Sequence, residues 1–391
     1  MPPLAIYADG ALTPLEEISE AVVLVEGGKI AAIGRRGELA LPPRVQEYSA
    51  HGMTVVPGFV DVHIHGAGGR DIMEGTSEAL DTVAATVARY GTTSLLATTV
   101  TASEERICRS AEGIAGYIRA QQQGPAGTAP RAEVLGIHFE GPFINPVQRG
   151  AQLAEWIAPP SVALLQRFLH AAGGAGKILT LAPELPGALD LIEAACEAGL
   201  VVAMGHTDAT YAEACAAIRH GATHAVHVFN AMRPFSHRET GVLGAVLTTP
   251  EVTAELIADG VHVDSPAMRL LLAAKGVQRV LLVSDATAAT AMPDGKYQLG
   301  LFEVSVSGGV CRNAEGRLAG STLTLDRALR NVVSLGVPLA DVVRMLTLNP
   351  ARLLGLEQTK GVLASGADAD LVLLDAQLEV AGVMTRGAGL R

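Results

Sequence analysis

The sequence predicts an α/β fold: a TIM (β/α)8 barrel with a small β-sandwich domain formed from both chain ends. Eight apolar segments alternate with helical patterns through the middle of the chain, which is the number and order expected of a TIM barrel. Both ends instead read as short strands broken by turns. The length of 391 residues fits one large barrel together with an accessory domain.

The predicted barrel strands are near-continuous apolar runs, as expected of parallel strands covered on both faces. They span residues 58–65, 93–100, 133–141, 178–184, 201–207, 224–230, 253–262 and 279–286. Helical patterns over 77–91, 188–199 and 208–221 end at Gly91, Gly199 and Gly221, where helix C-terminal glycines belong. A doubly wound open sheet is the alternative, but it requires a glycine-rich phosphate-binding fingerprint after the first strand. The segment HGAGGRD (65–71) lacks that spacing.

The barrel is expected over residues 58–351, and the β-domain over residues 1–57 and 352–391. EGGK, starting at Glu26, is a good hairpin turn in the first part of that domain. Residues 294–320 alternate and turn like a β-hairpin inserted after the eighth barrel strand.

Composition and charge exclude several functional classes. The net charge is −11 and no basic stripe interleaves with aromatic residues, which argues against nucleic-acid binding. No apolar run is long enough to span a membrane, and the N-terminus lacks a secretory signal pattern. Four scattered cysteines without a CxxC pair indicate neither disulfides nor a thiolate zinc site, so we expect a cytoplasmic protein; they are Cys108, Cys196, Cys215 and Cys311.

Several of the apolar runs end in a residue that can bind a metal. These residues are His63 and His65 in the first run, Glu140 in the third, His206 in the fifth, His227 in the sixth and Asp285 in the eighth. The C-terminal ends of barrel strands meet at one mouth, so side chains that are distant in sequence are expected to converge there. The i, i+2 spacing of His63 and His65 places both rings on one strand face.

This set of side chains suits a divalent metal, most readily Zn²⁺ or Fe²⁺. Imidazoles and carboxylates bind both ions, and one glutamate can bridge two of them. A metal lowers the pKa of water and polarises a carbonyl, and Asp285 is the best candidate to carry the proton from that water to a leaving amine. His138 lies two residues before Glu140 on the same strand face, so it is either a deeper ligand or a hydrogen-bonded core histidine, and we favour the core role. His224 is expected on the opposite strand face from His227.

The motifs together resemble a known family. PGFVDVHIHG (57–66) resembles the first-strand signature of the amidohydrolase superfamily, in which an HxH motif ends the first strand. More narrowly, the sequence is similar to the N-acetylglucosamine-6-phosphate deacetylase family over essentially its whole length. The motifs that carry this likeness are HFEGPFINP (138–146), LAPE (181–184), MGHT (204–207), HVFNAM (227–232), ADGVH (258–262) and VSDA (283–286).

The resemblance implies roles for individual residues. Glu140, His206 and His227 would bind the principal metal, with Asp285 as the general acid/base. The presence of His63 and His65 makes a second ion possible, giving one or two ions per subunit. The implied substrate contacts are Ala151, Gln152, Asn230, Ala231, Arg238, His262, Leu318, Ala319 and Gly320. Among these, Arg238 and the backbone N–H groups of Asn230 and Ala231 suit a phosphate.

The activity implied is removal of acetate from N-acetyl-D-glucosamine 6-phosphate, by an enzyme expected to be a homodimer. The partner is thus a small phosphorylated amino sugar, with no nucleic acid and no membrane. The galactosamine epimer and a D-aminoacylase-like acyl-amino-acid hydrolase remain alternatives, and Arg238 favours a phosphorylated substrate. An inactive barrel that serves as a binding protein is the rival from another class, but such proteins typically lose metal ligands.

Overall fold

A closed ring of parallel strands forms the centre of the molecule. The computed structural model describes residues 2–14, 16–123 and 129–390. Eight strands pair in the order β15-β14-β13-β12-β11-β10-β9-β6, and a parallel bridge between Ile64 and Ala286 joins the two ends of that series. They are β6 (Phe59–Ile64), β9 (Thr92–Thr99), β10 (Glu133–Glu140), β11 (Gly176–Leu181), β12 (Val201–Met204), β13 (Ala222–Ala225), β14 (Thr253–Ile257) and β15 (Val280–Val283). The predicted TIM barrel is confirmed.

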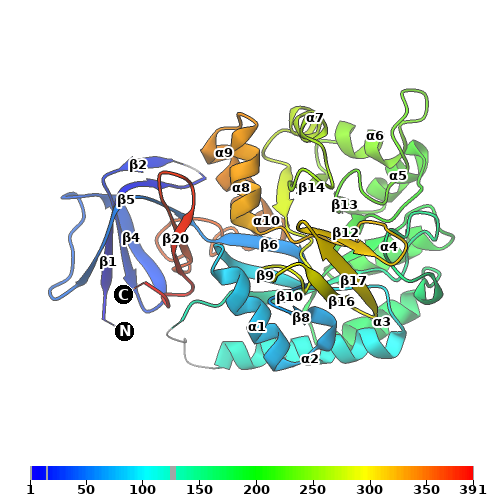
Figure 1. The fold of residues 1–391 in the computed structure, drawn as a ribbon, viewed down its shortest axis with the longest axis horizontal. Coiled ribbons are helices and arrows are strands. Elements are labelled where there is room, and N and C mark those ends of the chain that lie inside the picture. The colour runs from blue at the N-terminus through cyan, green and yellow to red at the C-terminus, as the bar shows by residue number, and fades with distance from the viewer. Residues whose placement is uncertain (1, 15, 124–128, 391) are drawn as a thin grey trace.

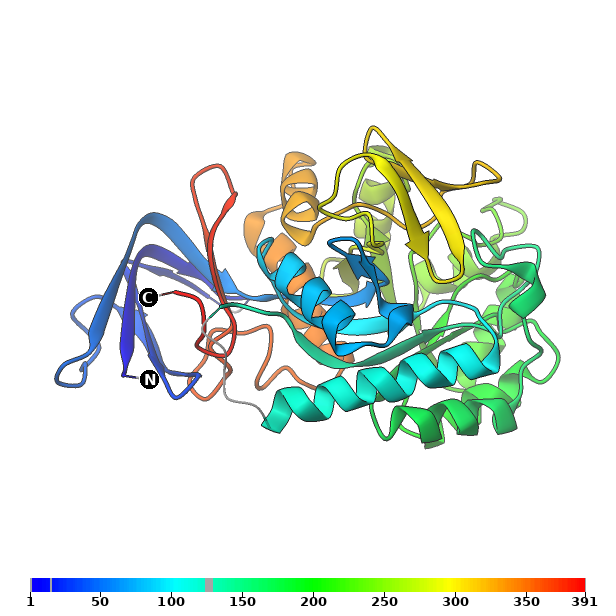
Figure 2. The ribbon, with the colours of Figure 1, turned by 60° about the horizontal axis from the view of Figure 1, so that its bottom comes forward.

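Helices alternate with these strands and cover the outside of the barrel (Figures 1 and 2). The first seven are α1 (Ser77–Ala88), α2 (Glu104–Gln123), α3 (Val162–Ala172), α4 (Ala188–Glu197), α5 (Tyr211–Arg219), α6 (Gly241–Thr248) and α7 (Ser265–Lys275). After the insertion described below come α8 (Leu325–Ser334), α9 (Leu339–Leu346) and α10 (Leu348–Leu353). Short 3₁₀ turns, η1 (Ile72–Glu74) and η2 (Ala154–Trp156), lie in the loops.

The predicted helices are present, with boundaries that local capping explains. Helix α5 begins at Tyr211 and not at 208, because Thr210 and Glu213 form a reciprocal capping box that satisfies free N–H groups. Gly91, Gly199 and Gly221 all have positive φ and lie two or three residues beyond their helices. They reverse the chain as the sequence predicts, although the helices stop slightly earlier.

Strands from both chain ends form one seven-stranded sheet, at the left of Figure 1. Its strands are β1 (Leu4–Leu12), β2 (Glu17–Ser19), β3 (Ala21–Glu26), β4 (Lys29–Arg35), β5 (Gln46–Pro57), β19 (Leu371–Leu374) and β20 (Val380–Met384). The two ends meet where β19 pairs antiparallel with β5. Buried residues such as Ile6, Ile30 and Leu373 give this sheet its own apolar core. The predicted β-domain built from both termini is therefore confirmed.

A small antiparallel sheet is inserted between the last barrel strand and α8. It has three strands, whereas the sequence pattern predicts a hairpin; they are β16 (Gly295–Leu299), β17 (Phe302–Ser307) and β18 (Val310–Asn313). Gly308 and Gly309, both with positive φ, make a second tight turn that returns the chain as β18. Another small pair, β7 (Gly66–Ala67) and β8 (Arg70–Asp71), follows the first barrel strand.

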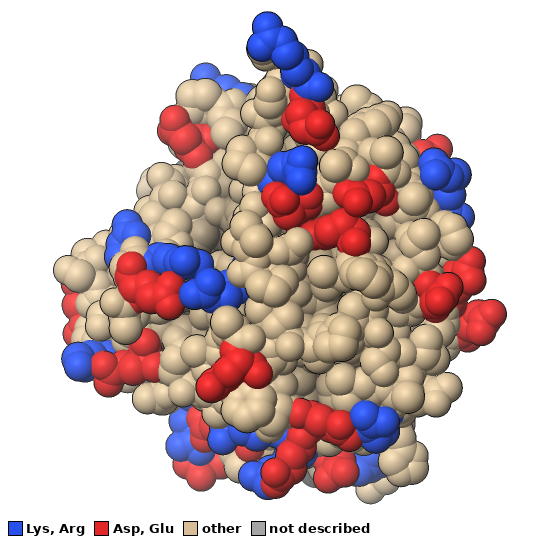
Figure 3. Space-filling view, turned by 90° about the vertical axis from the view of Figure 1, so that its right-hand side faces the viewer, with Lys and Arg blue, Asp and Glu red and all other residues tan. Residues whose placement is uncertain are grey.

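None of the helices in the described residues is both long enough and apolar enough to cross a membrane. On the face of the molecule turned away from the β-domain, basic and acidic side chains are interspersed, and no continuous basic patch is in view (Figure 3).

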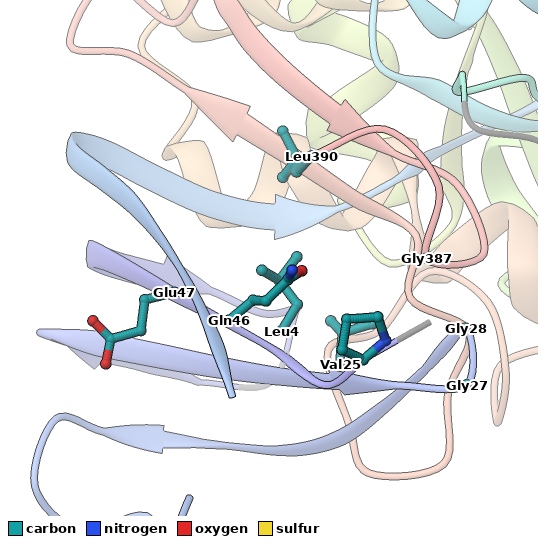
Figure 4. Close-up of a pocket in the computed structure, with 9 residues that line it drawn as sticks. Leu4, Val25, Gly27, Gly28, Gln46, Glu47, Gly387 and Leu390 are labelled. Atoms are coloured by element: carbon teal, nitrogen blue, oxygen red, sulfur yellow. The ribbon is translucent and has the colours of Figure 1, made fainter. Parts of the chain in front are cut away.

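A cavity of about 440 Å³ lies in the β-domain, between the start of β1 and the C-terminal segment. Figure 4 shows Leu4, Val25 and Leu390 around it. Glu47 is the one ionisable side chain among its described lining residues. This cavity therefore lacks the converging polar groups of a catalytic site.

Candidate active site and metal centre

Three of the predicted site residues occupy equivalent positions at the barrel mouth. His206, His227 and Asp285 are each the second residue after the end of a barrel strand, following β12, β13 and β15. All three have left-handed backbone conformations, with φ of 48°, 30° and 48°. Such conformations are unfavourable for residues with a Cβ and are typical of functional sites. The sequence pattern extends these strands to 207, 230 and 286, but they end earlier and the turns carry the ligands.

The side chains converge on one oxygen of Glu140, the last residue of β10. Glu140 Oε1 lies 3.2 Å from His63 Nε2, 3.2 Å from His206 Nε2 and 3.1 Å from His227 Nε2. On the other side, His65 Nε2 lies 3.4 Å from Glu140 Oε2 and 3.2 Å from Asp285 Oδ1. All six side chains are buried, Asp285 being the most exposed at 8%. The structure thus brings together every metal-ligating residue expected from the sequence.

This arrangement fits a divalent metal. In a tetrahedral zinc site with ligand distances of about 2.0–2.1 Å, neighbouring donor atoms lie roughly 3.3 Å apart. The spacings within Glu140, His206 and His227 are 3.1–3.2 Å, including 3.2 Å between the two Nε2 atoms. His63 Nε2 is buried and, although Glu140 Oε1 lies 3.2 Å away, it makes no hydrogen bond of suitable geometry with the described residues. A bound cation would satisfy this otherwise costly atom.

The electrostatics favour ionised carboxylates at the centre. Burial alone would raise the pKa of Glu140, but the neighbouring His63 and His206 outweigh it and hold that pKa well below its usual range. Burial also acts to raise the pKa of Asp285, and the hydrogen bond from His65 together with the charges of His63 and His65 lowers it. Asp285 is therefore a carboxylate, which can accept a proton.

A cavity of about 260 Å³ opens over this centre. Its lining includes most of the predicted substrate contacts: Ala151, Gln152, Asn230, Ala231, His262, Leu318 and Gly320. Ala319 lies between two lining residues but is fully buried, and its N–H donates to the Cys311 carbonyl. Arg238 is exposed and is not among the described residues that line the cavity.

Residues 54–388 match the model of the amidohydrolase family. The chain is a member of this family. It is 36% identical to the N-acetylglucosamine-6-phosphate deacetylase of Bacillus subtilis, over 96% of this chain and 94% of that protein. It is 39% identical to the N-acetylgalactosamine-6-phosphate deacetylase of Escherichia coli O157:H7, over 93% of each.

Solved structures give the same family assignment. A mutant N-acetyl-D-glucosamine-6-phosphate deacetylase from Mycobacterium smegmatis, in complex with N-acetyl-D-glucosamine-6-phosphate, superposes with a TM-score of 0.92 at 37% identity. The match covers 100% of this chain and 99% of the other. The corresponding enzyme from Pasteurella multocida matches with a TM-score of 0.91 at 30% identity, over 99% of both chains.

In this amidohydrolase, both the oxygen and the nitrogen of the Gln152 side-chain amide are hydrogen-bonded. Its Oε1 accepts from the Thr101 N–H at 3.0 Å, and its Nε2 donates to Glu140 Oε2 at 2.7 Å. Because a backbone N–H can only donate, the orientation of the amide is determined.

The ring of His262 is also oriented by a neighbour, since its Nδ1 lies 2.7 Å from Asp259 Oδ2. His262 Nε2 is then the ring nitrogen left for a ligand.

Glu255 is a central residue that the sequence analysis missed. This fully buried β14 carboxylate lies 2.8 Å from His63 Nδ1 and 3.0 Å from His224 Nε2, and it accepts the backbone N–H of His227 at 3.0 Å. His224 and His227 thus contact the same carboxylate, because β13 ends at Ala225 and strand alternation does not extend to His227. The sequence signal that could have identified Glu255 is a charged residue inside the otherwise apolar strand TAELI, because a buried glutamate needs a partner.

His138 takes the structural role expected of it. Its ring is fully buried, with Nδ1 3.1 Å from the Val62 carbonyl and Nε2 2.7 Å from Thr180 Oγ1. Burial, with a smaller effect of His63, lowers the pKa of His138 to about 3, so this imidazole is neutral.

Proposed function

We propose that this amidohydrolase is a metal-dependent deacetylase that hydrolyses N-acetyl-D-glucosamine 6-phosphate to D-glucosamine 6-phosphate and acetate in amino-sugar catabolism. The observation that carries the proposal is the convergence of three imidazoles on Glu140 Oε1, with the Asp285 carboxylate beside them. Whole-length similarity to deacetylases of this kind supports the same reaction.

In the proposed mechanism, Glu140, His206 and His227 would hold a divalent ion, Zn²⁺ or Fe²⁺. That ion would lower the pKa of water and polarise the acetamide carbonyl. Asp285 accepts a proton from the attacking water and donates it to the departing amine. The water oxygen bonds to the acetyl carbon as the C–N bond breaks, giving acetate and the free amine. His63 and His65 would supply donors for a second ion.

The remaining contacts position the sugar. The Gln152 amide is available near Glu140 to orient the acetamide group, and His262 Nε2 is available to a sugar hydroxyl or phosphate oxygen. The backbone N–H of Ala231 is proposed to bind phosphate. The Asn230 N–H, expected to do the same, instead donates to the His227 carbonyl at 2.9 Å. We further propose a cytoplasmic homodimer, in which the exposed Arg238 takes part in substrate binding.

The N-acetylgalactosamine 6-phosphate reaction is the second candidate, because a relative with that name is 39% identical. The two substrates share the phosphate and the acetamide and differ in one hydroxyl orientation. A D-aminoacylase-like activity has less support, since no relative described above carries that name.

The decisive experiment measures acetate release after the enzyme has been stripped with a chelator and reloaded with one metal at a time. Parallel assays use both N-acetylhexosamine 6-phosphates and their unphosphorylated forms. We expect turnover only with added divalent metal and a strong preference for a phosphorylated substrate. Metal-independent acetate release, or equal rates without phosphate, would contradict the proposal.

A further inference from the structure

The active-site cavity contains a cation that the sequence analysis did not assign. Arg317 follows β18 in the inserted sheet and lies beside Leu318, which contacts the same cavity. Among the described lining residues it is the only lysine or arginine. Because the protein has a net charge of −11, an anionic ligand depends on such a local cation.

The contacts of Arg317 place it at the phosphate-binding end proposed above. Its Nη1 donates to the Gly150 carbonyl at 3.2 Å. Gly150 is adjacent to both the metal ligands and the Asn230–Ala231 turn: a Cβ built on Gly150 would lie 3.3 Å from His206 Cε1 and 3.6 Å from Ala231 Cβ. Arg317 therefore lies on the side of the cavity where the Ala231 N–H is available, whereas the Asn230 N–H donates to the His227 carbonyl at 2.9 Å.

The Arg317 guanidinium keeps positive charge and N–H donors that the protein does not use. Glu315 lies 3.1 Å from Arg317 Nε and 3.2 Å from Arg149 Nη2, so one carboxylate is shared by two arginines. The cluster keeps one net positive charge. A guanidinium has five N–H groups; the Gly150 carbonyl accepts from one of them, and Nε faces the Glu315 carboxylate in an ion pair. Three remain to bind a ligand.

From these observations we propose that Arg317 binds the phosphate of the substrate and makes the enzyme prefer phosphorylated over unphosphorylated N-acetylhexosamines. The inference rests on the proposed function and adds to it a specificity residue from the inserted sheet. Arg317 forms a charge-assisted fork with the phosphate oxygens, while the Ala231 N–H binds the same group from the barrel.

The test compares Arg317→Met, Arg317→Lys and a matched control, Arg269→Met, in which the arginine is exposed on α7 away from the cavity. For N-acetylglucosamine 6-phosphate, Arg317→Met should raise KM about ten- to a hundred-fold with little change in kcat. Arg317→Lys should recover part of the loss. The kcat/KM for unphosphorylated N-acetylglucosamine should be nearly unchanged, whereas a merely structural role for Arg317 would lower both.

The affinity for glucosamine 6-phosphate, measured by calorimetry, tests the role of Arg317 independently of the proposed reaction. If the wild-type enzyme binds this compound but hydrolyses neither acetylated sugar phosphate, a weaker affinity in Arg317→Met supports the inference even though the proposed function fails. Equal affinities in the wild type, Arg317→Met and Arg269→Met would overturn the inference, as would the absence of any binding to the wild type.

Discussion

His63 Nδ1 and Glu255 Oε2 lie 2.8 Å apart in the fully buried centre of the barrel. Burial would raise the pKa of Glu255, but His63 and the hydrogen bond from His224 hold it well below its usual range, so the group is a carboxylate. His63 must then donate from Nδ1, which leaves Nε2 directed at Glu140. Glu255, which is not among the predicted metal ligands, therefore fixes the tautomer of His63, which is.

Removing the negative charge of Glu255 should weaken metal binding. Glu255→Gln is expected to lower the affinity for Zn²⁺ about 10–100-fold, because outer partners orient and polarise ligating histidines. Competition with a chromogenic chelator measures the change, with Glu47→Gln, in the β-domain, as the control. Unaltered affinity in Glu255→Gln would show that Glu255 serves folding alone.

A second prediction concerns the contact between the barrel and the β-domain. The buried Lys360 ammonium bonds Asp370 at 2.7 Å and Asp368 at 2.9 Å, and it also bonds Glu133 of β10. Lys360→Met would leave the buried Asp370 carboxylate without its ammonium partner, at a cost of about 3–5 kcal/mol in the free energy of unfolding, whereas Asp368 keeps its pair with Lys29 at 2.6 Å. Urea denaturation provides the measurement. Lys296→Met, which removes a solvent-exposed pair with Glu303, should leave the free energy of unfolding nearly unchanged.

The pH dependence of stability should contain a contribution from Lys275. Burial lowers the pKa of Lys275 from 10.5 to about 8, and its Nζ donates to the Val246 and Thr249 carbonyls at the end of α6. Between pH 8 and 10.5 the unfolded chain binds more protons at this site, so this group makes stability rise with pH.

The Lys275→Met variant isolates that contribution. The difference in unfolding free energy between wild type and variant should shift by about 1–3 kcal/mol in favour of the wild type from pH 7.5 to pH 10. Loss of the two hydrogen bonds adds an offset that does not depend on pH. A difference that is constant across this range would mean that Lys275 keeps its ordinary pKa.

A fourth prediction concerns the turn between β16 and β17, whose flanking Leu299 and Phe302 line the active-site cavity. Asp71 Oδ2 accepts the Gly300 N–H at 2.9 Å and so ties this turn to the barrel. Asp71→Ala should raise KM several-fold, because the cavity wall is less well positioned. Asp294→Ala, which removes a similar contact to Gly309 within the inserted sheet, should leave KM unchanged. Equal effects of the two substitutions would contradict this role.

The barrel could be predicted from the sequence because its strands are covered on both faces and appear as uninterrupted apolar runs. The ligands could be predicted because each stands at the end of such a run. Glu255 could not, since its role depends on the pairing of β14 with β13 and on the ring of His63, 192 residues away. Arg317 likewise lies in a turn whose approach to Gly150 depends on tertiary packing.

The central claim is that Asp285 transfers the proton between water and the leaving amine. Its most direct test is kcat for acetate release from N-acetylglucosamine 6-phosphate by Asp285→Asn, with metal content measured on the same sample. We expect kcat to fall about 10²–10⁴-fold while the metal at Glu140, His206 and His227 is retained. A variant with its full metal content and a near-normal kcat would contradict it.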